Sequence, residues 1–259
     1  MRGGAHTPRM GLEGRVALVT GAGGAGIGRS VALTLARDGA DVALNYHRKR
    51  EAAEQTAGAI EAMGRRALLI AADVADAAAV DAMVREAGER LGTLDILVNS
   101  AGGPWKPQDV TEIEPAHLRQ VIGREIEATY YLLRAVLPGM RTRGWGRIVS
   151  IGGHLADEWP FGPPDAPLDY PLGKAARHWL TRTLAPREAG RGITINAIAP
   201  GPTPRVTFEE ALASLRGERA AGAHGNVPQD VAEIAAFLCS DAAARVTGAV
   251  IPVPGATAV

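Results

Sequence analysis

The stretch "RVALVTGAGGAGIGRSVALTLA" (residues 15–36) joins a short apolar run to an amphipathic segment through a turn that is rich in glycine. Glycine lets the backbone turn tightly and lets another molecule approach it closely. The free N–H groups at the start of the following helix are suited to binding phosphate. The stretch therefore predicts a β-strand, a phosphate-binding turn and a helix in that order, which is the arrangement of a dinucleotide-binding fold.

The rest of the chain repeats this alternation of apolar runs and amphipathic segments. Most of the runs are continuous in Val, Ile and Leu, as expected for strands that are covered on both faces of a parallel sheet. We expect strands at 15–20, 41–46, 66–72, 94–100, 146–152, 193–199 and 249–253. The alternation predicts an α/β fold, a Rossmann-type doubly wound parallel sheet of about seven strands with helices on both faces. We expect a loose tail at 1–9 and a single domain at 10–259.

The composition argues against several classes of protein. Lys plus Arg and Asp plus Glu both total 28, and this balance does not favour a nucleic-acid partner or an anionic membrane surface. No apolar run approaches the ~20 residues that span a bilayer. The single cysteine, Cys239, excludes an internal disulfide framework and fits a reducing compartment, so a cytoplasmic location is expected. The six histidines lack paired spacing, so no metal is expected.

Six motifs, in order along the chain, resemble the short-chain dehydrogenase/reductase family. They are "TGAGGAGIG" (20–28), "ADV" (72–74), "NSAG" (99–102), "YPLGK" (170–174), "APGPT" (199–203) and "VTGAVIPVPG" (246–255). The resemblance implies that residues of these motifs hold a nicotinamide dinucleotide. They are Gly21, Gly26, Ile27 and Gly28 at the pyrophosphate, Asp73 and Val74 at the adenine, Asn99, Ala101 and Gly102 at the adenosine ribose, and Pro200, Gly201 and Thr203 at the nicotinamide side.

The end of the second expected strand indicates which dinucleotide is bound. An NAD site usually has Asp or Glu there, which accepts hydrogen bonds from the ribose hydroxyls. Here "LNYHRKRE" (44–51) has no acid before Glu51 and contains the cations Arg48, Lys49 and Arg50. A carboxylate repels a 2′-phosphate, whereas Arg and Lys pair with it. We therefore expect NADP(H), with Arg48 and Lys49 at the 2′ position; the alternative is a solvated basic start to a helix.

Tyr170 and Lys174 are the expected catalytic pair. Their spacing places both side chains on one face of a helix that starts near Tyr170. A nearby ammonium stabilises the phenolate and lowers the pKa of a tyrosine from its usual value of about 10. In the family that the chain resembles, this tyrosine is the general acid of carbonyl reduction, and the lysine also holds the nicotinamide ribose. The resemblance implies the same roles here, including contact of both residues with the cofactor.

Two positions depart from the family pattern. The family has a serine after the fifth strand and an asparagine in the preceding helix, and alignment places Gly153 and Glu125 there. Ser150 is no substitute, because alternation along the strand sends it to the opposite face. His154 is a candidate donor to the substrate carbonyl, or an ordinary surface or core histidine. We expect Glu125 to take part in the proton relay or to pair with Lys174; the alternative is an exposed helix charge.

These observations together predict an NADP(H)-dependent oxidoreductase that reduces a carbonyl or oxidises an alcohol on a small organic substrate. Two alternatives remain, because the usual Ser and Asn are missing. One is a non-redox enzyme on the same scaffold, such as a dehydratase, isomerase or cyclase, and the other is a cofactor-binding protein without turnover.

Substrate selection is expected in the segments 154–169 and 204–226, which diverge from the family. Trp105 and Trp159 either line a hydrophobic substrate pocket or pack between loops. Arg205 stands near the nicotinamide position, where the family often has threonine. The family commonly assembles through its long middle helices and its C-terminal strand region, so the resemblance implies a homo-oligomer, either a tetramer or a dimer.

Overall fold

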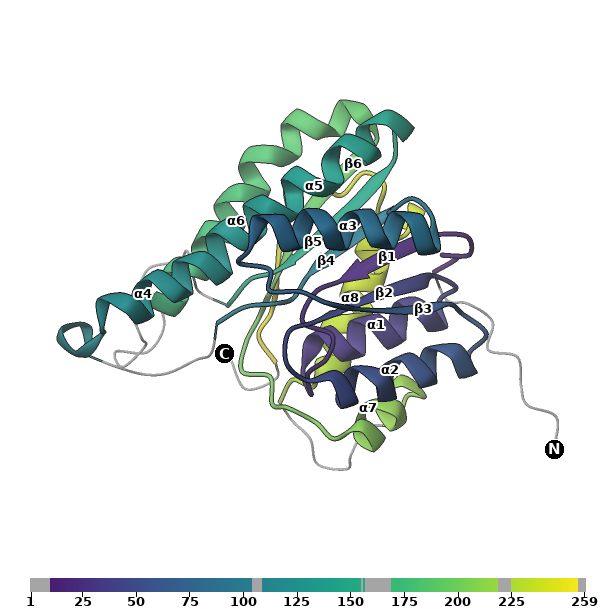
Figure 1. Cartoon of the computed structure of the whole chain (residues 1–259), viewed down its shortest axis with the longest axis horizontal. Helices are drawn as coiled ribbons and strands as arrows, with labels where there is room; N and C mark the ends of the chain where they lie inside the picture. Colours follow the sequence, from purple (N-terminus) through teal and green to yellow (C-terminus); the bar gives the residue numbers. More distant parts are fainter. Residues whose placement is uncertain (1–9, 104–108, 155, 157–168, 219–224, 256–259) are drawn as a thin grey trace.

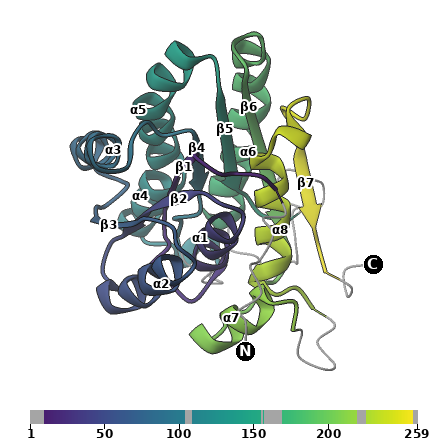
Figure 2. The ribbon, with the colours of Figure 1, turned by 90° about the vertical axis from the view of Figure 1, so that its right-hand side faces the viewer.

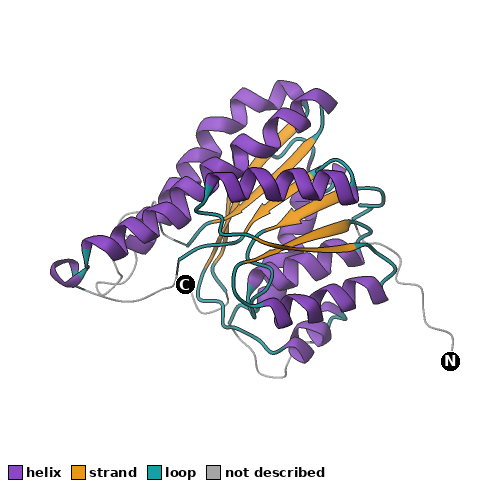
Figure 3. Ribbon diagram, in the orientation of Figure 1, coloured by secondary structure: helices purple, strands orange, loops and turns teal. Residues whose placement is uncertain are grey.

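The computed structural model describes residues 10–103, 109–154, 156, 169–218 and 225–255. All seven expected strands are present in one sheet (Figures 1 and 3). They are β1 (Val16–Val19), β2 (Asp41–Tyr46), β3 (Ala67–Ala71), β4 (Ile96–Asn99), β5 (Gly146–Ile151), β6 (Ile193–Pro200) and β7 (Val250–Val253). The predicted fold class is confirmed. The predicted tail at 1–9 lies outside the described residues.

The strand order reverses between β1 and β4, and this reversal leaves a crevice that suits a ligand. The sheet runs β3-β2-β1-β4-β5-β6-β7, and every neighbouring pair is parallel. The chain moves outward from β1 to β3 and then crosses back to β4 on the other side of β1. In open α/β sheets, ligands bind outside the carboxyl ends of the strands at this reversal. The glycine-rich turn follows β1 at this point.

Helices cover both faces of the sheet (Figures 1 and 2). One face carries α1 (Ile27–Arg37), α2 (Arg50–Ala62), α7 (Phe208–Leu215) and α8 (Pro228–Cys239), and the other carries α3 (Ala77–Leu91), α5 (Ala128–Arg143) and α6 (Asp169–Glu188). Side chains alternate between the two resulting cores along β1. Ala17 and Val19 pack toward α1 and α8, whereas Val16 and Leu18 pack toward α3 and α5.

The helix before β5 changes its winding at one place. It runs through α4 (Pro115–Ile122), η2 (Gly123–Glu127) and α5, and η2 is a turn of the wider π-helix. The N–H of Ala128 donates to the carbonyl of Gly123, five residues back. Such turns inside α-helices occur frequently at functional sites. This one carries Glu125.

Short 3₁₀ turns complete the described structure: η1 (Val110–Glu112), η3 (Ala189–Arg191) and η4 (Asp241–Ala243). Within the described part of the chain, no helix combines the length and the apolar character needed to cross a membrane.

Gly192 fixes the turn at the amino ends of β5 and β6. Its φ of +72° is left-handed, and a Cβ there would collide with the carbonyl oxygen of Gly144. Gly64, with φ of +76°, has open space at the same place. We expect Gly64→Ala to cost about 1 kcal/mol through its backbone conformation alone. Gly192→Ala should cost more than about 2 kcal/mol, because the backbone itself must move.

Denaturant unfolding of the two variants measures this difference. An equal loss of stability would contradict the collision at Gly192.

Candidate active site

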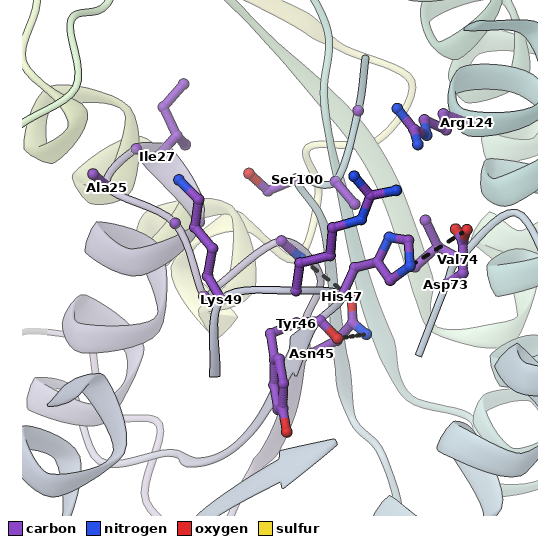
Figure 4. Close-up of a pocket in the computed structure, with 18 of the residues that line it drawn as sticks. Ala25, Ile27, Asn45, Tyr46, His47, Lys49, Asp73, Val74, Ser100 and Arg124 are labelled. Carbon is purple, nitrogen blue, oxygen red and sulfur yellow. Dashed lines mark hydrogen bonds and ion pairs between the residues drawn. The ribbon is translucent and has the colours of Figure 1, made fainter. Parts of the chain in front are cut away.

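A pocket of about 530 Å³ opens at the carboxyl ends of β1, β2, β3 and β4 (Figure 4). Most residues that the sequence assigned to the cofactor line it. These are Gly21, Gly26, Ile27, Gly28, Arg48, Lys49, Asp73, Val74, Ala101 and Gly102. The structure therefore brings motifs from four separate strand ends into one site.

The glycine-rich turn fits a bound phosphate group. Gly21 has φ of +68°, and a Cβ there would lie 3.0 Å from the backbone of Ala101. A Cβ on Gly28 would lie 2.7 Å from the carbonyl oxygen of Gly21. Gly26 caps α1 without any side-chain hydrogen bond, and the first turn of α1 has no acidic residue. The N–H groups at the start of α1 are therefore available to an anion.

The basic run 48–50 divides in two. Arg48 and Lys49 line the pocket, whereas Arg50 begins α2, outside the pocket lining, and pairs with Glu54 at 2.8 Å. Figure 4 shows Lys49 on one side of the pocket and Arg124, from η2, on the other. The site thus offers cations to a phosphate without an acid at the end of β2.

Asn99 is a buried residue whose amide makes hydrogen bonds within the protein. It does not line the pocket and is only 1% exposed. Its side chain accepts from the Thr20 hydroxyl at 3.2 Å and donates to the Thr129 hydroxyl at 2.8 Å. The Thr20 oxygen accepts in turn from the N–H of Ala101 at 3.0 Å. Asn99 therefore shapes the turn that follows β4.

Asn45 takes part in the pocket although sequence reasoning missed it. It lines the pocket, accepts from the N–H of Gly21 at 3.3 Å and donates to the carbonyl of Ala72 at 3.1 Å. It thus links the glycine-rich turn to the end of β3. The signal was available, because an amide in a buried strand needs polar partners.

Pro200 ends β6, Gly201 and Thr203 follow it, and all three lie outside the lining of this pocket. Further along, the N–H of Val206 donates to the carbonyl of Ala25 at 2.9 Å. This bond brings the segment after β6 over the glycine-rich turn. Arg205, which the sequence analysis placed near the nicotinamide position, consequently lines the pocket together with the glycine-rich turn.

Tyr170 and Lys174 lie where the helix spacing predicts. The helix α6 begins at Asp169, and the Lys174 Nζ atom lies 5.3 Å from the centre of the Tyr170 ring. Gly153 faces the same site, because a Cβ there would lie 3.1 Å from Lys174 Cγ and 3.8 Å from Tyr170 Cε1. The alignment that placed the missing serine at Gly153 therefore agrees with the geometry.

Glu125 is completely buried, so the alternative of an exposed helix charge is wrong. Its Oε2 lies 3.2 Å from Lys174 Nζ and 2.8 Å from Arg177 Nε, and its Oε1 accepts from the N–H of Gly103 at 2.6 Å. Burial raises the pKa of this carboxyl, but the charges of Arg177 and Lys174 and the Gly103 N–H together bring it below its usual value. Glu125 is therefore a carboxylate at neutral pH.

The pKa of Tyr170 moves in the direction opposite to the one expected from the sequence. Burial raises it, and the Glu125 carboxylate raises it further against the opposing effect of Arg177. Burial also lowers the pKa of Lys174 to about 8, despite the attraction of Glu125. The sequence supplied the spacing of the pair but not its burial, and burial is the larger cause for both groups.

Arg177 and His178 were also missed. Arg177 is fully buried and donates to the carbonyls of Asn99 at 3.2 Å, of Ile151 at 2.9 Å and of Ala101. His178 Nε2 accepts from the N–H of Gly153 at 3.4 Å. An arginine and a histidine within the "YPLGKAARH" segment were the available signal, since such groups inside a core require partners.

Other predicted positions carry less information. The N–H of His154 donates to the carbonyl of Pro200 at 2.9 Å, which joins the ends of β5 and β6. Trp105, Trp159 and most of the segment 154–169 lie outside the described residues. Among the residues that the structure describes, no group of His, Cys, Asp and Glu is arranged to hold a metal ion.

This chain is similar to known proteins in sequence and in fold. A family model described as Enoyl-(Acyl carrier protein) reductase matches residues 21–255. The acetoacetyl-CoA reductase of Allochromatium vinosum is 35% identical over 93% of this chain and 97% of its own length. The 3-oxoacyl-[acyl-carrier-protein] reductase FabG of Pseudomonas aeruginosa is 34% identical over 95% of this chain and 98% of its own length. The chain belongs to the short-chain dehydrogenase/reductase family.

Solved structures of the same family agree with this assignment. A short chain dehydrogenase from Burkholderia cenocepacia, solved in complex with NADP, is 33% identical with a TM-score of 0.81, over 94% of this chain and 97% of that one. A short-chain dehydrogenase/reductase variant from Serratia marcescens is 31% identical with a TM-score of 0.82, over 96% of this chain and all of that one. The family predicted from the motifs is confirmed.

Proposed function

We propose that this protein is an NADP(H)-dependent oxidoreductase that reduces a carbonyl group on a small organic substrate. The observation that carries the proposal is the grouping of the half-buried Tyr170 with the buried Lys174 and Glu125 beside Gly153, next to a pocket suited to a dinucleotide. The reductase names of the relatives and the NADP complex of a similar structure support it. When bound, the nicotinamide would supply the hydride.

The residues at the strand ends would hold the cofactor. The glycine-rich turn and the start of α1 would bind the diphosphate, and Arg48 and Lys49 would bind the 2′-phosphate. Asp73 and Val74, which line the pocket, would lie at the adenine, and Ala101 and Gly102 would lie at the adenosine ribose. Asn99 supports this turn from behind. Pro200, Gly201 and Thr203 would flank the nicotinamide side.

Tyr170 is the proton donor. Its raised pKa keeps the phenol protonated at neutral pH, so its hydroxyl can give a proton to the carbonyl oxygen while the carbonyl carbon gains a hydride. Lys174, with a pKa of about 8, is mostly an ammonium at neutral pH and stabilises the phenolate that remains. Glu125 takes part through its contact with Lys174.

Replacing Tyr170 by phenylalanine tests the proton donor. The variant keeps the ring and removes the hydroxyl, so we expect carbonyl reduction to fall by roughly 10²–10⁴-fold. The affinity for NADPH, measured by cofactor fluorescence, should change little. Activity close to that of the parent enzyme would show that the family's chemistry is not used here.

The choice of cofactor depends on Arg48 and Lys49. Replacing both by alanine removes two charge-assisted contacts, and NADPH should bind roughly 10–100-fold more weakly while NADH changes little. Arg50→Ala is the matched control, because Arg50 pairs with Glu54 outside the pocket. Titration of both reduced cofactors by fluorescence measures the ratio. An unchanged ratio in the double variant would refute the assignment of NADP(H).

Gly153 tests whether a missing hydroxyl limits the rate. Gly153→Ser should raise ketone reduction by up to ~10²-fold, since a donor to the substrate oxygen can contribute that much. Gly153→Ala is the control, because it adds the same Cβ, 3.1 Å from Lys174 Cγ, without the hydroxyl. Steady-state rates with one ketone compare the two variants.

Loss of activity in Gly153→Ser, with normal cofactor binding, would indicate that substrate fills the space beside Gly153. That result would favour the non-redox alternative over the reductase.

We also propose a homotetramer in the cytoplasm, built from a single domain at 10–259. The large apolar side chains Tyr130 on α5 and Trp179 on α6 are 56% and 64% exposed, and both helices are long. The lone cysteine, Cys239, is free and buried, which fits a reducing compartment.

Light scattering tests the assembly. At micromolar concentration the protein should have four times the mass of the chain, and Trp179→Glu should reduce it by placing a charge in the buried interface. A monomer in the parent protein would refute the tetramer.

A further inference from the structure

Three charged side chains are buried together where η2 packs against α6. Glu125 and Arg177 have no solvent-exposed area, and Lys174 is 5% exposed. One carboxylate oxygen, Oε2 of Glu125, contacts both cations, at 3.2 Å from Lys174 Nζ and 2.8 Å from Arg177 Nε. A buried carboxylate needs such partners, because its desolvation is costly.

The backbone around Glu125 leaves room for this carboxylate. A Cβ on Gly102 would lie 2.5 Å from Glu125 Oε1, and a Cβ on Gly173 would lie 2.6 Å from Glu125 Cβ. The same Oε1 atom accepts a hydrogen bond from the Gly103 N–H at 2.6 Å. Glu125 is therefore held by close packing on two sides and by contacts at both oxygens.

Arg177 is fixed at the carboxyl ends of β4 and β5. Its terminal nitrogens donate to the carbonyls of Asn99, Ile151 and Ala101, which come from or directly follow these strands. The Nε atom lies 2.8 Å from Oε2 of Glu125. Arg177 cannot leave this position without abandoning several buried carbonyl groups, whose desolvation would then be uncompensated.

The charges beside Tyr170 follow from these contacts. Glu125 and Lys174 alone would form a neutral pair, and the phenol would lose the cation that favours its ionised form. One carboxylate against two cations leaves a single net positive charge. Resting on the proposed function, we propose that Arg177 is a positioning residue that holds the Glu125 carboxylate in place and restores to the Tyr170–Lys174 pair the positive charge that Glu125 removes.

Other ionisable groups near the pair come from α4 and α6. His117 contacts the carboxylate of Asp169 at 2.9 Å, and the same carboxylate accepts from the N–H of Tyr170 at 2.8 Å. His178 lies against Gly152 and Gly153. These groups are present in every variant described below, so differences among those variants report Glu125 and Arg177.

Titration of the Tyr170 phenol tests the proposal without turnover. Tyrosinate absorbance is followed against pH, and the curve of the matching Tyr170→Phe protein is subtracted from that of each variant, because the chain has 4 tyrosines. Arg177→Met removes a cation and should raise the pKa of Tyr170 by about one unit or more. Glu125→Gln removes an anion and should lower it by a similar amount, while Glu125→Gln with Arg177→Met should return it near the parent value.

The alkaline limit of carbonyl reduction should shift in the same directions. Arg177 also lowers the pKa of Lys174, whereas Glu125 raises it. The limit set by loss of the Lys174 proton, at about pH 8 in the parent, should therefore move up in Arg177→Met and down in Glu125→Gln. If Arg177 and Glu125 had structural roles alone, their replacement would not shift the alkaline limit of carbonyl reduction in opposite directions.

Arg177→Lys and the double variant Glu125→Gln with Arg177→Met keep the test decisive if the single variant Arg177→Met fails to fold. Arg177→Lys keeps the charge and should titrate like the parent. The double variant has no carboxylate to compensate, and it should titrate above Glu125→Gln because it lacks the arginine. The proposal would be overturned if the Tyr170 phenol titrated equally in the double variant and in Glu125→Gln. Equal shifts of its pKa in Arg177→Met and Glu125→Gln would also overturn it. Absence of reductase activity would contradict the proposed function alone, because the phenol titration does not require turnover.

Discussion

The carboxylate of Glu125 lies out of contact with water at the junction of η2, α6 and the turn after β4, and its charge places demands on every neighbour. Two cations must be close, backbone N–H groups must point toward it, and the chain must leave space for it. Lys174 and Arg177 meet the first demand and the N–H of Gly103 meets the second. A buried carboxylate without any one of these partners would cost free energy. This cost explains why η2, α6 and the turn after β4 pack together here.

The same carboxylate connects the fold to the chemistry. The wide turn of η2 carries Glu125 to the start of α6, which presents Lys174 and Tyr170 on one side. Gly153, at the end of β5, closes the other side of the pair. The proton-transfer group is thus assembled from a helix, a helical turn and a strand end that are distant in the sequence. The dinucleotide pocket opens nearby, at the carboxyl ends of β1 to β4.

Local patterns were sufficient to predict the sheet and the motifs. Continuous apolar runs gave all seven strands, and the spacing of Tyr170 and Lys174 gave their common face. The basic run was predicted only in part, because the pairing of Arg50 with Glu54 depends on where α2 begins.

Contacts between distant segments could not be read from the sequence. The role of Arg177 depends on its contact with Glu125, which lies on a different helix. The role of Asn45 depends on its hydrogen bond with the turn after β1. The pKa of Tyr170 depends first on burial, and spacing along a helix does not reveal burial. Asn99 was assigned to the ribose by resemblance, whereas tertiary packing engages its amide with two threonine hydroxyls.

Hydride transfer itself is the most direct test of this account. The absorbance of NADPH should be followed with a panel of ketones and 3-oxoacyl thioesters, alongside NADH under identical conditions. The account predicts oxidation of NADPH that requires a carbonyl compound and that is faster than oxidation of NADH. A protein that binds NADPH but oxidises none of it with any member of the panel would contradict the central claim that this chain is a reductase.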